Sequence, residues 1–469
     1  MEKLKNNCIF KALNTFINFI ENLITNSGVY SVLTKDVTRK KDNSFFENIL
    51  YKIIGFLRMI FEKIKLDKVF EGSIFAKTEL FIGITIILAP IMPTMVDLLL
   101  VIGTFISFLL KVLLDKDFKF VYSPVNMFLN IFMLIYFISS LVSYDIGTSL
   151  KIGLLLLCFM LFYYVIINTI KTKKQLNVMI ALFAIVGLLI ATYGIYQYVF
   201  GGSFASSSFV DKKMFEDINA RVSGTFDNPN VMGEYLLLVL PLLFTYCFKF
   251  KGFRPKLISL CCIGVAVIAL ALTYSRGCYL GLIVSCAVFL LLISIKFILL
   301  FIAGAIALPF VLPKSIMNRL TSIGNTEDNS TSYRISIWKG AIALIKDYWY
   351  RPIGQGSEAF NSVYPYYALN GVSAEHTHNL FLQIAVETSM FGLLSFVALI
   401  FRIFQSLFSS IKNCTDMNIK YSLIGFVSAL SGFLVQSMFD NTWYNNRIVL
   451  VFWIFVGLSQ SAKYLSKNS

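Results

Sequence analysis

Long apolar runs separated by short polar segments cover most of the chain from residue 78 onward. An α-helix rises about 1.5 Å per residue, so roughly 20 apolar residues cross a hydrocarbon layer about 30 Å thick. The pattern predicts twelve membrane-spanning helices, at residues 78–93, 95–114, 123–143, 149–170, 176–199, 231–248, 257–273, 277–294, 297–312, 380–401, 421–439 and 447–462. Pro90 and Pro93 leave one alternative, in which the first two runs form a single kinked helix. The predicted fold class is an all-α integral membrane protein.

One polar segment, residues 313–379, is much longer than the others. Within it, apolar residues recur at helical spacing over residues 335–345, directly after Ser332. This pattern predicts an interfacial helix that is capped by Ser332 and covers a cavity. Residues 352–356 contain two glycines and predict a turn; a glycine pair without a preceding strand is a poor nucleotide-binding signal.

The first part of the chain, residues 1–77, differs from the rest. It holds thirteen lysines and arginines against eight acidic residues, and it contains two amphipathic stretches, near 9–24 and 46–64. A basic amphipathic helix is typical of a segment that lies on an anionic membrane leaflet. A helix pair packed on the cytoplasmic face is the alternative. No cleaved signal peptide is expected, because residues 1–11 are polar and basic. The chain thus divides into a cytoplasmic region, 1–77, and a membrane domain, 78–469.

Composition supports the membrane assignment. Hydrophobic residues make up 57% of the 469 residues and the mean hydropathy is +0.73, which excludes a water-soluble globule. The chain has 45 Phe and 23 Tyr but only 10 Pro, which favours long helices over an outer-membrane barrel. The basic residues behind the net charge of +15 are distributed among the loops between the apolar runs, so nucleic acid is not an expected partner.

The eight cysteines show neither a disulfide pattern nor a metal-binding pattern. Nearly all lie inside or beside apolar runs, so we interpret them as small core residues. They are Cys8, Cys158, Cys247, Cys261, Cys262, Cys278, Cys286 and Cys414.

The distribution of positive charge predicts the topology. Basic residues gather in alternate loops, at 111–119, 171–174, 249–256, 296, 402–420 and 463–467. The short turns 144–148 and 440–446, on the other side, carry none. By the positive-inside rule, both termini are cytoplasmic and the protein lies in the cytoplasmic membrane. The 313–379 segment is then a long extracytoplasmic loop.

Several arginines break this rule because they fall on the predicted outer side. They are Arg221, Arg276, Arg319, Arg334 and Arg351. Positive charge on the translocated side is disfavoured, and an anionic ligand at the outer face would explain its presence. Simple solvation is the alternative for Arg319 and Arg351. Arginine presents a planar fork of donors that matches phosphate oxygens, so we expect a phosphate or pyrophosphate substrate.

Two of these arginines lie in short motifs. Tyr274-Ser275-Arg276-Gly277 separates two apolar runs, and a guanidinium at membrane depth is costly unless it is paired or functional. A structural salt bridge is the alternative for Arg276. Arg221 opens the polar segment 221–230, in which Asn228 and Asn230 suit a turn and a helix cap.

The only two histidines, His376 and His378, lie at the end of the long loop. A histidine can take a proton from a hydroxyl nucleophile near neutral pH, and His378 begins a helix whose free N–H groups favour anions. A metal site or a structural role is the alternative. No third histidine and no cysteine lies near the pair, so we expect no metal and no cofactor.

Taken in order, these motifs resemble the O-antigen ligase and polymerase superfamily. They are residues 221–230, Ser275-Arg276-Gly277, Arg334-x3-Trp338, and His378-Asn379-x7-Glu387 followed by Gly392. The resemblance covers residues 80–462. The chain departs from the family where Ser389 and Gly392 replace paired glycines, and where Gly233-Glu234 replaces small apolar residues.

The resemblance implies a metal-independent inverting glycosyltransferase whose donor is a glycan on undecaprenyl pyrophosphate. Arg221, Arg276 and Arg334 would hold the pyrophosphate, and His378 would take the proton from the acceptor hydroxyl. Secondary site candidates are Asn228, Asn230, Ser275, Asn379 and Glu387. The implied partners are a lipid-linked glycan donor, a glycan or lipid acceptor, membrane lipids and other polysaccharide-assembly proteins.

Two questions stay open at the level of sequence. A ligase adds a finished glycan to a distinct acceptor, whereas a polymerase adds it to a further repeat unit, and both fit the motifs. A transporter of an inorganic anion or of a lipid-linked glycan also has about twelve helices. Glycan transporters are expected to show charged residues at mid-membrane and two similar halves. Here the charges cluster on one face, and no internal repeat is evident.

Overall fold

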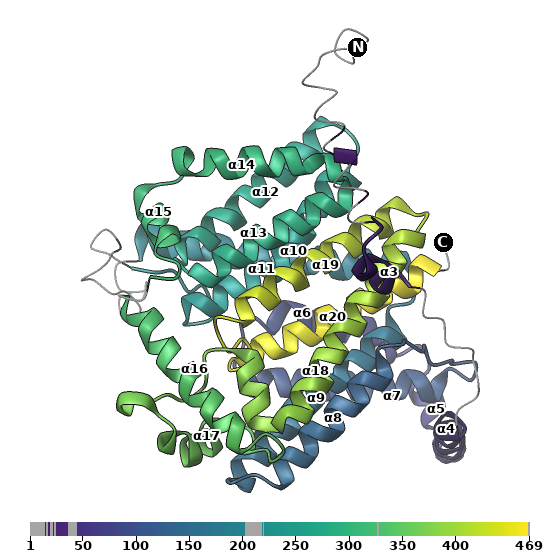
Figure 1. Ribbon diagram of the computed structural model, residues 1–469. Helices are drawn as coiled ribbons and strands as arrows, with labels where there is room; N and C mark the ends of the chain where they lie inside the picture. Colours follow the sequence, from purple (N-terminus) through teal and green to yellow (C-terminus); the bar gives the residue numbers. More distant parts are fainter. Residues whose placement is uncertain are drawn as a thin grey trace.

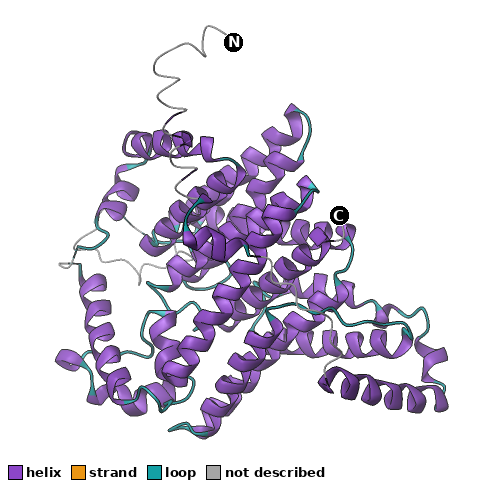
Figure 2. Ribbon diagram, turned by 45° about the vertical axis from the view of Figure 1, so that its right-hand side comes forward, coloured by secondary structure: helices purple, strands orange, loops and turns teal. Residues whose placement is uncertain are grey.

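The fold is helical throughout the part of the chain that the structure describes. The computed structural model describes residues 15, 17–18, 22, 25–35, 45–201, 218, 220–325 and 328–467. Within these ranges Figure 2 shows helices and loops but no strand. The all-α prediction is confirmed.

Each of the twelve predicted spans corresponds to a helix. They are α6 (Thr78–Leu88), α7 (Thr94–Leu114), α8 (Asn126–Leu141), α9 (Ile146–Thr169), α10 (Lys173–Phe200), α11 (Pro229–Lys249), α12 (Phe253–Leu272), α13 (Arg276–Ile293), α14 (Ile298–Val311), α18 (Leu380–Asn413), α19 (Met417–Ser437) and α20 (Asn446–Lys467). Within the described residues, nine helices are long and apolar enough to cross a membrane, while α6, α8 and the apolar stretch Ile295–Ala307 are shorter. The count of twelve spans therefore stays a prediction. Pro90 and Pro93 lie between α6 and α7, which are separate helices.

Helices α11, α19 and α20 form the centre of the bundle (Figure 1). The apolar part of α20 is 94% buried and that of α11 is 78% buried, against 22% for α12. α19 packs closely against α13 because two glycines face each other: a Cβ added at Gly281 or at Gly432 would lie 2.6 Å from the other residue's carbonyl oxygen. Small residues that allow such close approach are typical of helix packing in membranes.

The long loop folds into short helices along one side of the bundle (Figure 1). They are α15 (Lys314–Thr321), α16 (Asn329–Asp347) and α17 (Ser357–Val363), followed by the 3₁₀ turns η3 (Tyr364–Tyr366) and η4 (Leu369–Gly371). α16 is the helix that the sequence predicted, but its cap is Asp328 and not Ser332. The Asp328 carboxylate accepts a hydrogen bond from the Ser330 backbone N–H at 2.8 Å, which places Ser332 inside the first turn.

α18 is broken at Ser389, and the loop packs against the break. Ser389 has φ 67° and ψ 177°, so the regular helical hydrogen bonds are interrupted there. The Val386 carbonyl accepts from the Ile353 N–H at 3.2 Å, and the Met390 N–H donates to the Trp349 carbonyl at 2.9 Å. Gly354, with φ +99°, approaches the turn between α8 and α9 so closely that a Cβ would lie 1.8 Å from Ser143 Oγ. Loop backbone thus replaces the helical bonds that the break removes.

Before α6 the described chain forms α3 (Gly28–Thr34), α4 (Phe45–Lys63), α5 (Leu66–Phe70) and the 3₁₀ turn η1 (Ile74–Ala76). α4 covers most of the second predicted amphipathic stretch, and its Arg58 Nη2 donates to the Val112 carbonyl at the end of α7 at 2.6 Å. Large apolar side chains of α4, including Phe56 and Met59, are exposed. That α4 lies on a membrane leaflet stays a prediction. Most of the first amphipathic stretch lies outside the described residues.

The break in α18 leads to a stability prediction. The backbone angles of Ser389 fall in a region that only glycine adopts readily, at a cost of roughly 1–3 kcal/mol for other residues. We expect Ser389→Gly to raise the melting temperature of the detergent-solubilised protein. Ser389→Val, whose branched side chain fits this conformation worse, should lower it.

Ser395→Gly is the matched control, because Ser395 lies in the same helix with regular helical structure. There glycine should cost about 1 kcal/mol and lower the melting temperature. If Ser389→Gly lowered it as much as Ser395→Gly, the strain at Ser389 would be disproved.

Candidate functional site

A cavity of about 560 Å³ lies where the long loop meets the ends of α11, α19 and α20. All of these segments were predicted to face outward. Of the residues proposed from the sequence, the cavity brings together Arg221, Asn228, Asn230, Arg334 and His378. It is also lined by Val231, Glu234, Arg319, Asp328, Asn329, Ser330, Tyr333, His376, Asp440, Asn441, Tyr444 and Asn445.

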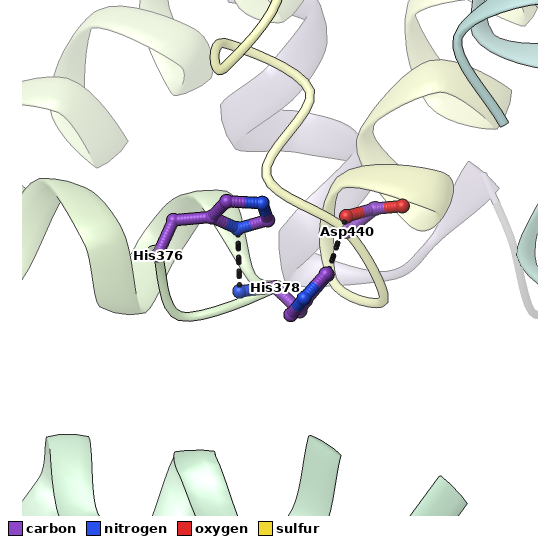
Figure 3. Close-up of side chains that lie close together, drawn as sticks. All are labelled: His376, His378 and Asp440. Carbon is purple, nitrogen blue, oxygen red and sulfur yellow. Dashed lines mark hydrogen bonds and ion pairs between the residues drawn. The ribbon is translucent and has the colours of Figure 1, made fainter. Parts of the chain in front are cut away.

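His378 and Asp440 form a hydrogen-bonded pair at this cavity (Figure 3). His378 Nδ1 lies 3.0 Å from Asp440 Oδ1. A carboxylate can only accept a hydrogen bond, so Nδ1 carries the proton and Nε2 keeps its lone pair. The imidazole is therefore oriented as a base, and the carboxylate can stabilise the positive charge that forms when Nε2 takes a proton.

Asp440 is held by more than the histidine. Its Oδ2 accepts from Asn230 Nδ2 at 2.9 Å and lies 3.6 Å from Arg334 Nη2. Burial opposes ionisation of this carboxyl, but the hydrogen bond from His378 and the charge of Arg334 outweigh it and lower the pKa of Asp440. Asp440 is the functional residue that sequence reasoning missed, because it appeared only as part of a short outer turn. A lone acid at the outer end of a span, facing a predicted group of cations, was the available signal.

The backbone around His378 is fixed by three neighbours. The His378 N–H donates to His376 Nδ1 at 3.1 Å, and the His378 carbonyl accepts from Trp338 Nε1 at 3.4 Å. Asn379 caps α18 through its side-chain oxygen, which accepts from the Phe381 N–H at 2.9 Å. Its amide also donates to the Met438 carbonyl at 2.9 Å. Asn379 thus fixes the backbone next to His378 but does not line the cavity.

The Arg334-x3-Trp338 motif has a direct structural meaning. The two residues are one helical turn apart on α16, so they project from the same face. Arg334 contacts Asp440, and Trp338 contacts the backbone of His378. One helix of the loop therefore contacts both members of the pair.

Arg276 does not line the cavity. Its guanidinium forms an ion pair with the buried Asp328, the cap of α16, and a hydrogen bond to the Ser322 carbonyl at 3.3 Å. This is the structural salt bridge that the sequence left as the alternative. Ser275 precedes α13 at the cap position without a side-chain capping bond. The motif therefore ties α16 to the bundle, and its arginine is separated from the cavity by Asp328.

Two other arginines line the cavity while almost fully buried. Arg221, 6% exposed, donates to the Thr273 carbonyl and to Asn230 Oδ1, both at 2.7 Å. Arg319, 7% exposed, donates to the Tyr274 carbonyl at 3.2 Å. Burial, followed by repulsion between the guanidiniums, lowers the pKa of Arg221 to about 9 and that of Arg319 to about 10. A group of buried, mutually repelling cations is stabilised by a bound anion.

Glu387 belongs to a neighbouring, smaller cavity of about 120 Å³. Its Oε1 accepts from Gln383 Nε2 at 2.9 Å and from the Gly356 N–H at 3.3 Å. Glu387 thus joins the loop to α18 near the break. The two cavities share His376, Asn441 and Tyr444 as a common wall.

His376 accepts the hydrogen bond from the His378 N–H and packs on Tyr444, with ring centroids 4.4 Å apart. Burial and the adjacent His378 lower the pKa of His376 to about 4. In the described part of the chain, His376, His378 and Asp440 are the one group of three close enough to hold a metal ion. His376 Nδ1 and the Asp440 oxygens already accept hydrogen bonds, so a cation held by all three residues would have to compete with these bonds, whereas His378 Nε2 keeps its lone pair.

Comparison with known families agrees with the order of the motifs. Residues 261–397 match the family described as O-Antigen ligase, a segment that runs from α12 into α18 and contains Arg334 and His378. No curated protein matches the chain. The family points to the transfer of lipid-linked glycans in surface polysaccharide synthesis. Over residues 261–397, this chain is similar to the O-antigen ligase family.

Proposed function

We propose that this protein transfers a glycan from undecaprenyl pyrophosphate to an acceptor hydroxyl, at the outer face of the cytoplasmic membrane. One observation carries the proposal: the His378–Asp440 pair lies in a cavity that is also lined by Arg221, Arg319 and Arg334. A base and an anion-binding group in one cavity are what transfer from a glycosyl pyrophosphate requires.

The arginines would bind the pyrophosphate of the donor. Its leaving group gains negative charge as the bond to the sugar breaks, and preorganised cations stabilise that charge most in the transition state. Burial strengthens this effect, because charges interact more strongly away from water. Arg319 joins Arg221 and Arg334 in this role, because it lines the cavity. Arg276 acts indirectly, by holding Asp328 and hence α16.

The reaction is a single displacement. The acceptor oxygen attacks the anomeric carbon, and its proton passes to His378 Nε2 while the bond between that carbon and the pyrophosphate oxygen breaks. The products are the new glycosidic bond, with inversion at the anomeric carbon, and undecaprenyl pyrophosphate. No acid is needed, since pyrophosphate leaves as a stable anion. Asp440 stabilises the imidazolium until it returns its proton to water.

We expect His378→Ala to lower kcat for glycan transfer by roughly 10²–10⁴-fold, the usual contribution of a general base. Asp440→Asn should lower it in the same direction, because an amide cannot stabilise the imidazolium. The measurement uses purified protein in liposomes with a lipid-linked repeat unit and candidate acceptors. Ladders of repeats would identify a polymerase, and one addition to a distinct acceptor a ligase.

Arg334→Ala tests the anion site in the same assay and should weaken both donor binding and turnover. Lys339→Ala is its control, since Lys339 is an exposed cation on α16 that does not line the cavity. Full activity of His378→Ala would disprove the proposed role of His378 as the general base. Failure of the wild-type protein to transfer to any acceptor, combined with uptake of the anion or lipid, would favour a transporter.

Metal removal gives a separate prediction. Because His376 Nδ1 and both Asp440 oxygens already accept hydrogen bonds, we expect transfer to be unchanged after treatment with EDTA and dialysis. Restoration of a lost activity by one divalent ion would instead assign His376, His378 and Asp440 as its ligands.

A further inference from the structure

Glu234 is a buried acidic residue in the wall of the cavity that the proposed mechanism does not use. It lies on α11, four residues after Asn230, and is 2% exposed. A buried acidic side chain with incomplete hydrogen bonds is costly, so its presence needs a reason.

The hydrogen bonds of Glu234 are incomplete. Its Oε1 accepts from Gln436 Nε2 at 3.1 Å, whereas its Oε2 has no hydrogen-bond partner. The Gln436 side-chain oxygen also lacks one. Two buried acceptors without donors lie together here. Such groups are rare in folded proteins, and each usually indicates a water or ligand that supplies the missing donor.

Glu234 forms no direct ion pair with the cavity arginines in the part of the chain that the structure describes. The ion pair of Arg334 is with Asp440. A direct ion pair therefore does not account for the buried carboxyl group.

The position of Glu234 relative to the reacting groups indicates which part of a substrate it meets. Asn230 contacts Arg221, on the pyrophosphate side, and Asp440, the partner of the base. The anomeric carbon must lie between these two sides, next to Asn230. Residues four apart share one face of a helix, so Glu234 lies about one turn, or about 6 Å, deeper on the same side.

We propose that Glu234 is a specificity-determining residue that accepts a hydrogen bond from the first sugar of the donor, the sugar bonded to pyrophosphate. The donor group is a hydroxyl or an amide N–H on that ring. This inference rests on the proposed function and deepens it. A site built around a buried acceptor rejects a substrate that lacks the matching donor, because the acceptor is then left unpaired.

The test combines variants of Glu234 with a set of synthetic polyprenyl-pyrophosphate donors. Each donor has one hydroxyl or acetamido group of the first sugar replaced by hydrogen. With wild-type protein, one analogue should lose roughly ten- to a hundred-fold in kcat/KM, as expected when a buried acceptor is left without its donor. With Glu234→Leu, the intact donor should fall to the level of that analogue, so the two no longer differ. Glu234→Gln, which keeps one acceptor oxygen, should show part of the discrimination.

Ser285→Ala is the matched control. Ser285 is also a buried residue with an unpaired oxygen, on α13 against α19, but it does not line the cavity. It should keep the wild-type preference among donors. Melting temperatures of all variants separate lost recognition from unfolding.

The inference is overturned if Glu234→Leu stays folded and active and still discriminates among the donor analogues as the wild type does. A wild-type protein that transfers no donor at all would instead remove the proposed function. The two failures are therefore distinguishable.

Discussion

The carboxylate of Asp440 connects four separate parts of the chain, and the geometry of the cavity depends on it. It lies in the turn between α19 and α20 and contacts His378 before α18, Asn230 on α11 and Arg334 on α16. In a poorly hydrated environment such contacts are stronger than in water, and loss of the central acid would leave cations facing one another. The remaining interactions of the site follow from this one. Asn230 can orient Arg221 because its amide is held by Asp440, and the imidazole has one defined tautomer for the same reason.

Helices were predictable from the sequence because apolar runs are a local signal, and all twelve predicted runs are helical. Their ends were less predictable. α18 was expected to stop near residue 401, yet it continues to Asn413, because Ile403, Leu407 and Ile411 recur at helical spacing and stay buried. Arg402 and Lys412 suggested a loop, although both charges are compatible with an amphipathic helical extension.

Site residues were predictable as far as they belong to motifs, and their pairings were not. The sequence identified Arg221, Arg334 and His378, which line one cavity. It could not show that Arg276 pairs with Asp328, nor that Asp440 completes the base, because partners separated by 52 and 62 residues meet only after folding. Arg319 was ambiguous for the same reason: an arginine in a long polar loop is usually solvated, and only its burial against the Tyr274 carbonyl places it at the cavity.

The loop helix α16 couples the position of the long loop to the His378–Asp440 pair. Arg334 and Trp338 reach the Asp440 carboxylate and the His378 backbone from positions one turn apart. A rigid helix cannot shift along or about its axis without losing both contacts together. A displacement of α16 would therefore change the surroundings of the Asp440 carboxylate and of the His378 backbone together, so the loop and the pair behave as one unit.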